Sequence, residues 1–416
     1  MEPLSLFQNS FQRVLFFFAF FLVFSFNLFL EYSAYQKFIK EEVRKLDATI
    51  LNIYKKENYN VVKLKHKKFT FFTSISKELQ LKQLQKINLY IITKQISFIE
   101  YLKGFYAKSF NHNLLKSTET LKTTLYEYIN SQHANPQMGS LYNALFLATN
   151  ITQELRKFTT NYGIAHLVAI SGFHIGIISA MLYFILNIVY KPIHQKYYPY
   201  RNKRIDILIV VSFLLFGYLF LLDFAPSLLR AFVMFIFGIF LLRSNIKLLS
   251  FETLLIIVLI ILALFPKLLF SLSLWFSVTG VFYIFLFLQY FNKLNKYLQL
   301  IFFNLWIYLA INPVVHYFFA QTSFEQLYSP LLTLVFTLFY PLAAFLHIIG
   351  LGDIFDSVLT TWQHIEVFRF EKATPLWFLL LYLFCSLLAI FEKKAFILLH
   401  ILLIGFTFFL FYDFCF

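Results

Sequence analysis

Residues 165–175 read AHLVAISGFHI, an apolar stretch in which two histidines and a serine stand at His166, Ser171 and His174. The run around them is long enough to cross a bilayer, and polar side chains at that depth are costly, so they need a reason. The chain of 416 residues is 59% hydrophobic and only 14% charged, far outside the range of soluble globular proteins. The composition predicts a polytopic α-helical membrane protein.

Apolar runs of about the length that a bilayer requires recur along the chain. We expect about ten transmembrane helices, at residues 14–30, 164–189, 205–222, 225–242, 248–265, 268–291, 298–319, 330–350, 375–390 and 396–411. The first run has no small-residue cleavage site, so we expect an uncleaved anchor rather than a signal peptide. Cys385 and Cys415 lie in apolar C-terminal segments and support neither a disulfide framework nor a CxxC metal site.

Basic residues in short loops indicate which side of the membrane each loop faces. The segment 191–204 has five basic residues and no acidic one, so we expect it in the cytoplasm. The N-terminus is then cytoplasmic as well, and the polar region 31–162 is external. Lys393 and Lys394 fall outside in this arrangement, against the rule, so the topology after Phe291 stays open.

The external region is strongly basic. Residues 31–130 contain 18 Lys and Arg against 9 Asp and Glu, which indicates an anionic partner. The segments 46–54, 59–72 and 87–99 are rich in β-branched and aromatic residues and are expected to be strands.

In the middle strand, alternation places a row of lysines and two rings on one face. These residues are Lys63, Lys65, Lys67, Phe69 and Phe71. Lysines that follow phosphates and rings that stack on bases are typical of single-stranded nucleic acid binding. Taken alone, the residues favour the alternative of a solvated strand with both rings in the domain core.

Apolar residues recur at spacings of three and four between Leu141 and Phe158. This pattern predicts an amphipathic helix within residues 131–162, at the outer membrane surface and leading directly into residues 165–175.

If residues 164–189 form one continuous helix, its small residues make one stripe suited to close helix packing. They are Ala165, Ala169, Gly172, Gly176 and Ser179. At about 100° per residue, His174 lies opposite this stripe, with Ser171 and His166 to either side of His174. Histidine is a poor lipid-facing residue, so we expect that second face to border a water-filled path or another polar surface. A break at Ser171-Gly172 cancels these angles.

Catalytic and metal-binding interpretations are weaker. Ser171 lacks the flanking glycines of a nucleophile elbow, because Ala169 and Phe173 stand in their places. The sequence contains no HExxH, no Cys/His zinc spacing and no Walker A motif. We therefore expect no metal, no cofactor and no enzymatic activity. Packing histidines without chemistry remain an alternative, as do histidines that bind a metal.

Two other function classes stay open. One is a membrane-embedded hydrolase or transferase on lipid-linked substrates, with His166, Ser171 and His174 as its polar centre. It lacks an acidic residue to orient either histidine. The other is a secondary transporter of small anions, against which the missing internal repeats and the basic external region count.

A second motif is Pro226-Ser227-Leu228-Leu229-Arg230-Ala231, at the start of the fourth predicted transmembrane helix. Pro226 suits the first turn of a helix. Arg230 follows about one turn inside the membrane near its outer end. It either snorkels to the headgroups or lines an entry vestibule for a polyanion.

The stretches AHLVAISGFHIGI at 165–177 and PSLLRAFVM at 226–234 closely resemble the ComEC family of DNA-uptake channels of naturally transformable bacteria. The resemblance places the family's signature residues on His166, Ser171, Gly172 and His174, and its membrane arginine on Arg230. It also implies an external OB-like domain at about residues 46–113, which favours residues 63–71 as a DNA contact. The implied function is an inner-membrane channel that moves single-stranded DNA into the cytoplasm during natural transformation.

The resemblance divides the chain into four parts. They are an N-terminal transmembrane anchor (1–30), an external basic OB-like domain (31–130), an amphipathic helix at the outer membrane surface (131–162) and a competence-type transmembrane channel domain (163–416). Many family members also carry a metallo-β-lactamase-like domain with an HxHxDH motif, which is missing here. The implied partners are therefore the lipid bilayer, single-stranded DNA, a periplasmic DNA-binding competence protein, a cytoplasmic helicase-like ATPase and a separate nuclease.

Overall fold

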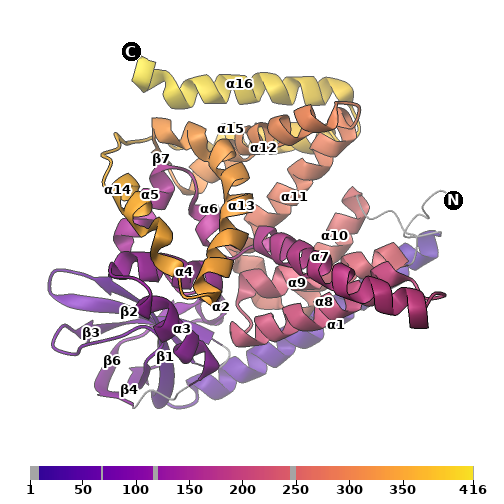
Figure 1. Cartoon of the computed structure of the whole chain (residues 1–416). Helices are drawn as coiled ribbons and strands as arrows, with labels where there is room; N and C mark the ends of the chain where they lie inside the picture. The colour runs from indigo at the N-terminus through magenta and orange to yellow at the C-terminus, as the bar shows by residue number, and fades with distance from the viewer. Residues whose placement is uncertain (1–8, 67–68, 116–119, 244–249, 416) are drawn as a thin grey trace.

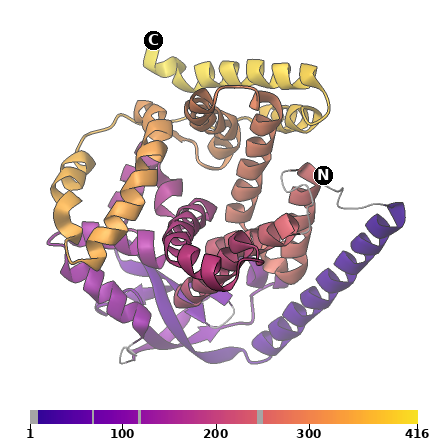
Figure 2. The same ribbon diagram turned by 45° about the vertical axis from the view of Figure 1, so that its right-hand side comes forward.

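The fold is taken from a computed structural model, which describes residues 9–66, 69–115, 120–243 and 250–415. Lys67 lies outside these residues. Figure 1 shows a small β-structure at one corner of the molecule, with helices over the rest. Helix α1 (Ser10–Ile39) leads into the β-structure and, as Figure 2 shows, runs along an outer edge of the helical part. It packs against α10 (Phe251–Leu264), and Asn27 donates a hydrogen bond to the Ala263 carbonyl at 2.9 Å.

The β-structure is one six-stranded sheet whose edges are brought together. Its strands are β1 (Val43–Lys55), β2 (Tyr59–His66), β3 (Phe69–Ser76), β4 (Lys86–Ile92), β5 (Phe105–Tyr106) and β6 (Ser109–Leu114). The order is β5-β3-β2-β1-β4-β6. Because β5 pairs with β3 and the next strand, β6, pairs with β4, the segment 105–114 bridges both edges and closes the sheet into a barrel. Helix α2 (Phe98–Lys103) starts at a Ser97–Glu100 capping box, so the strand predicted to reach residue 99 in fact ends at Ile92.

Strand alternation gives the barrel an apolar interior. Leu46, Ile50, Leu64, Phe71 and Leu89 all point inward and are fully or almost fully buried.

The helices that follow the barrel form a second core. They are α3 (Leu121–Ser131), α4 (Pro136–Leu147), α5 (Gln153–Asn161), α6 (Ala165–Val168), α7 (Gly172–Tyr197), α8 (Lys203–Leu221) and α9 (Pro226–Arg243), joined by α13 (Ser329–Ile348). The single amphipathic helix predicted within 131–162 is wrong, because α4 ends at Ala148 in a left-handed conformation (φ 54°) and α5 begins five residues later. Most of α4 is buried in this core rather than lying on a surface.

The remaining helices form a third core, farther along the chain from the barrel. It is built from α11 (Leu272–Phe291), α12 (Lys296–Phe318), α15 (Leu376–Leu388) and α16 (Lys393–Cys415). Short elements complete the chain: η1 (Pro266–Phe270), η2 (Phe324–Tyr328), η3 (Gly352–Phe355), α14 (Asp356–Gln363), β7 (Gln321–Thr322) and β8 (Phe370–Glu371). Figure 1 shows α16 on the side of the molecule opposite the barrel.

Within the described residues, seven helices are long and apolar enough to cross a membrane, at Ser10–Ile39, Gly172–Tyr197, Lys203–Leu221, Leu272–Phe291, Lys296–Phe318, Phe324–Ile348 and Lys393–Tyr412. The other three predicted runs form shorter apolar helices, at Ser227–Phe240, Phe251–Leu264 and Leu376–Leu388. The chain is a multi-pass α-helical membrane protein with a small N-terminal β-domain.

Candidate functional site

The motif at 165–177 is broken into two helices. α6 ends at Val168, the backbone is extended at Ser171 (φ −140°, ψ −177°), and α7 begins at Gly172. Ser171 is the N-cap residue of α7, and its backbone N–H donates to Nδ1 of His174 at 3.2 Å. This is the reciprocal bond of a capping box, with histidine in the place usually taken by Glu or Gln. The expected continuous helix is therefore wrong, and the angles derived from it do not apply.

His174 points into the protein. Its side chain is fully buried, and its ring lies edge-on to Phe336 and Tyr340, at centroid distances of 5.5 and 4.9 Å. Because Nδ1 accepts the Ser171 N–H, the ring proton is on Nε2 and the imidazole is neutral. Nε2 is buried and has no hydrogen-bond partner among the described residues. His174 thus anchors the start of α7 to α13 and does not face a water-filled path.

The small residues that were expected to pack against another helix lie instead on an exposed face. Ala165, Ala169, Gly172 and Gly176 are exposed. A Cβ placed on Gly176 meets no described atom within 4 Å, and one placed on Gly172 meets only Cβ of Ala231, at 3.7 Å. The predicted packing stripe is therefore wrong, because the helix is anchored through the side that carries His174.

His166 lies on this open side. Its side chain is accessible to solvent, and its Nδ1 is 3.0 Å from the Gly163 carbonyl. The surrounding protein nevertheless removes enough hydration to lower the pKa of His166 below its usual value.

Arg230 is buried on α9 with only 4% of its surface exposed. One guanidinium N–H donates to the Ser273 hydroxyl at 3.2 Å, and Nε has no partner among the described residues. Arg230 thus turns inward and does not snorkel outward. Its sequence neighbour Ala231 contacts Gly172, so the arginine and the motif meet where α9 packs against the start of α7. A buried cation without a carboxylate favours a bound anion.

The geometry offers little for catalysis. The Ser171 hydroxyl is 3.4 Å from Nδ1 of His174, a long contact to a nitrogen that already accepts the Ser171 N–H. Neither His166 nor His174 makes a hydrogen bond to a carboxylate in the described part of the chain. No group of His, Cys, Asp and Glu among the described residues is arranged to hold a metal ion.

The barrel brings lysine and aromatic side chains together, but not all the predicted ones. His66 pairs with Phe69 across a hairpin, so residues 59–72 form two strands and the alternation changes phase between them. Lys63 is therefore opposite Phe72, with Nζ 5.7 Å from its ring, whereas Phe71 is opposite Leu64 inside the barrel.

The expectation that Phe69 and Phe71 share the lysine face is wrong. Phe71 is fully buried, and Phe69 packs on Phe38, Tyr101 and Phe105.

A second lysine and ring pair extends the outer face of the barrel. Nζ of Lys45 is 5.8 Å from the ring of Tyr90, which stacks on Phe110 at 5.6 Å. On the other side, Tyr54 lies 6.4 Å from Phe72. Sequence reasoning missed these rings because it treated residues 59–72 as one strand and not as β2 and β3. The signal was available as two polar residues, Lys67-Lys68, between two alternating runs.

Lys65 attaches the barrel to the helical core. Its Nζ donates to the Asp223 carbonyl at 3.0 Å, and Lys122 Nζ is 3.1 Å from the Asp223 carboxylate. Burial lowers the pKa of Lys65. Asp223 and Phe224 both adopt left-handed backbone (φ 53°) in the turn between α8 and α9. The two lysines thus hold a strained turn that leads into the helix carrying Arg230.

A buried polar cluster ties the segment before α4 to α13 and α14. His133 Nδ1 is 2.9 Å from the Asp356 carboxylate, His133 Nε2 is 3.1 Å from His347 Nε2, and His347 Nδ1 is 2.7 Å from the Ala343 carbonyl. These contacts link the Asp356 carboxylate, the two imidazole rings and the Ala343 carbonyl in one continuous chain of hydrogen bonds. Tyr142 stacks on His133 at 4.8 Å. No spacing in the sequence relates residues 133 and 356, and the cluster was not predicted.

Comparison with known proteins gives one match. A family model described as competence protein matches residues 148–413, the range that holds both motifs and the helices from α5 to α16. No curated protein and no solved structure matches the chain.

Proposed function

The chain belongs to the competence protein family, and from this membership we propose that it moves one strand of DNA across the inner membrane during natural transformation. The family indicates a role in DNA uptake, and the apolar helices give a multi-pass membrane protein. Single-strand translocation, an inner-membrane location and a cytoplasmic N-terminus are parts of the proposal.

One observation carries it. The basic barrel is attached through Lys65 to the turn at Asp223, seven residues before the buried Arg230. DNA held on the barrel is therefore delivered to the part of the helical domain where α9 meets the start of α7. A buried guanidinium suits a passing phosphate, because it is a fixed donor that stays charged.

The outer face of the barrel supports a DNA contact. Lys63 with Phe72 and Lys45 with Tyr90 combine a cation and a ring on neighbouring strands. Such pairs bind single strands with little sequence preference, because the cation meets phosphate and the ring stacks on a base. The strand order, with a last segment bridging β3 and β4, supports an OB-like barrel.

The path across the membrane is proposed to follow the open face of Ala165, Ala169, Gly172 and Gly176, with His166 at its outer end. Small side chains leave room for a polymer, and no described atom fills the space next to Gly176. A periplasmic DNA-binding protein, a separate nuclease and a cytoplasmic helicase-like ATPase are proposed to supply capture, strand removal and driving force.

The test is a deletion strain supplied with labelled duplex DNA. We expect label in the periplasm and none in the cytoplasm, and a plasmid copy of the gene restores entry. Transformation at the wild-type frequency in the deletion strain overturns the proposal.

The barrel contact has its own test with the full chain in detergent. The double variant Lys63→Gln/Phe72→Ala is expected to bind a single-stranded oligonucleotide less tightly and with a shallower salt dependence. The control is Lys94→Gln, which removes a lysine of the same barrel that pairs with Glu42. Equal weakening in both variants contradicts a localised contact.

The competing function is a hydrolase or transferase centred on Ser171, favoured only by the contact between its hydroxyl and His174. Ser171→Ala separates the two. If Ser171 is a nucleophile, the variant loses nearly all enzymatic activity. If Ser171 only caps α7, the variant keeps its function and loses about 1 kcal/mol of folding stability.

A further inference from the structure

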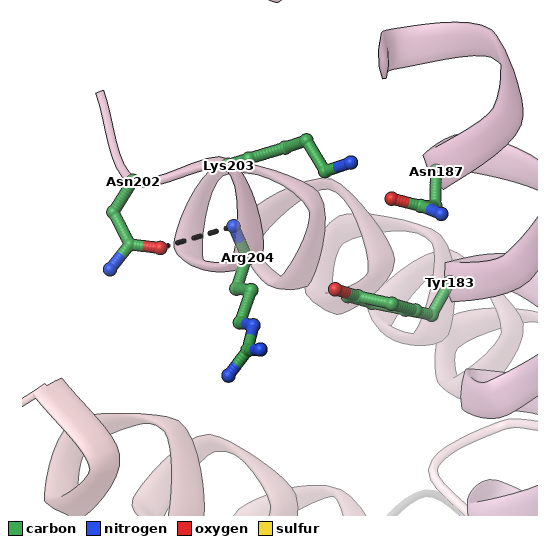
Figure 3. A pocket seen from close by; sticks show the side chains of 5 residues that line it. All are labelled: Tyr183, Asn187, Asn202, Lys203 and Arg204. Carbon is green, nitrogen blue, oxygen red and sulfur yellow. Dashed lines mark hydrogen bonds between the residues drawn. The ribbon is translucent and has the colours of Figure 1, made fainter. Parts of the chain in front are cut away.

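A cavity of about 580 Å³ lies between α7 and the start of α8, toward the other end of α7 from the signature motif. It is lined by Tyr183 and Asn187 of α7 and by Asn202, Lys203 and Arg204. Figure 3 shows Lys203 extending toward Asn187 and the Tyr183 hydroxyl turned toward α8. All five side chains can donate hydrogen bonds and none is acidic.

The two cations of this cavity are not neutralised. Lys203 and Arg204 form no ion pair among the described residues, and the nearest acid along the chain, Asp206, is already engaged. Arg201 binds both oxygens of Asp206, and the Tyr190 hydroxyl donates to the same carboxylate at 2.9 Å. The cavity therefore favours an anion.

The cavity lies at the level where the apolar parts of α7 and α8 give way to the basic segment 191–204. The bond from Tyr190 to Asp206 sets these residues of α7 and α8 at one level. Beyond it, residues 191–204, which include the end of α7 and the start of α8, are rich in basic residues, while the rest of both helices is apolar. Near it, large apolar side chains are exposed on both helices: Phe184, Ile185, Ile188, Ile209, Val210 and Phe213. This is the level at which lipid headgroups meet their acyl chains.

We propose that this cavity binds the headgroup of one anionic phospholipid. Its phosphate lies between Lys203 and Arg204, the Asn187 amide bonds a hydroxyl of a glycerol headgroup, and the acyl chains cover the exposed apolar side chains. Basic pockets between transmembrane helices suit anionic headgroups. A choline headgroup brings a positive charge next to both cations and is disfavoured. The apolar surface beside the cavity fits a lipid better than a DNA strand.

The test is native mass spectrometry of the full chain released from nanodiscs that contain equal amounts of phosphatidylglycerol and phosphatidylcholine. The wild-type protein is expected to retain phosphatidylglycerol in preference. Lys203→Gln/Arg204→Gln is expected to lower that preference about tenfold or more. Asn187→Leu, which removes the amide without changing charge, is expected to lower it as well.

The matched control is Lys191→Gln/Lys196→Gln, which removes two charges from the same basic segment, 191–204, outside the cavity. Its preference is expected to stay as in the wild type. An unchanged preference in the Lys203→Gln/Arg204→Gln variant overturns the proposal, and so does an equal loss in the control. Displacement of phosphatidylglycerol by millimolar inorganic phosphate assigns the cavity to free phosphate, and displacement by a single-stranded oligonucleotide assigns it to DNA. Either result overturns the lipid assignment.

Discussion

Replacing His174 separates a structural role of this residue from a chemical one. His174→Ala removes the acceptor of the Ser171 N–H and leaves space between Phe336 and Tyr340. Deleting a buried ring costs roughly 3 kcal/mol, and the lost hydrogen bond about 1 kcal/mol more. His174→Gln keeps a side-chain acceptor at the third position of α7, where capping boxes use glutamine, and should cost about 1 kcal/mol.

The assay compares thermal unfolding of the purified full chain in detergent with transformation frequency per molecule in the membrane. We expect a large loss of thermal stability and of membrane-inserted protein for His174→Ala. We expect a small loss for His174→Gln, with transformation per inserted molecule close to the wild type. If His174→Gln folds normally yet abolishes transformation, the imidazole has a chemical role and the structural interpretation is wrong.

Three further outcomes follow from the barrel and its attachment. Phe71→Ala should destabilise the barrel by about 3–5 kcal/mol, because the ring is fully buried, and limited proteolysis should then cut within residues 43–114. Lys65→Ala should speed hydrogen exchange in the turn at Asp223, while Lys65→Arg restores part of the protection, since an arginine also reaches a carbonyl. His112 has a pKa lowered by burial, so the unfolded chain binds a proton that the folded barrel does not. Barrel stability should therefore hold above about pH 6.5 and fall as the pH drops through the lowered pKa of His112, and His112→Gln should flatten this pH dependence in thermal melts.

The membrane class of this protein was predictable because long apolar runs depend only on local composition. Seven of the predicted runs form helices long enough to span, and the family itself was recognisable from the two motifs at 165–177 and 226–234. The basic character of the barrel was also readable from the charge of residues 31–130.

Side-chain directions were not predictable where the chain changes phase. The alternation changes phase between β2 and β3, so Phe69 and Phe71 lie toward the barrel interior instead of on the expected outer face. Three non-helical residues before Gly172 moved His174 from an expected polar path to a contact with α13. The periodicity of one strand or helix does not predict the orientation of residues beyond a break. After each short interruption, the face on which every following residue lies has to be determined anew.

The open space beside Gly176 allows the width required beside α7 to be measured with side chains of increasing volume. Because a Cβ placed on Gly176 meets no described atom within 4 Å, alanine fits there, and Leu and Trp extend the series to larger side chains. In each variant that keeps the wild-type unfolding temperature, the width beside α7 decreases by a known step. If DNA follows the proposed path, the step at which DNA entry ceases, with unfolding temperature unchanged, reports the clearance that the path requires.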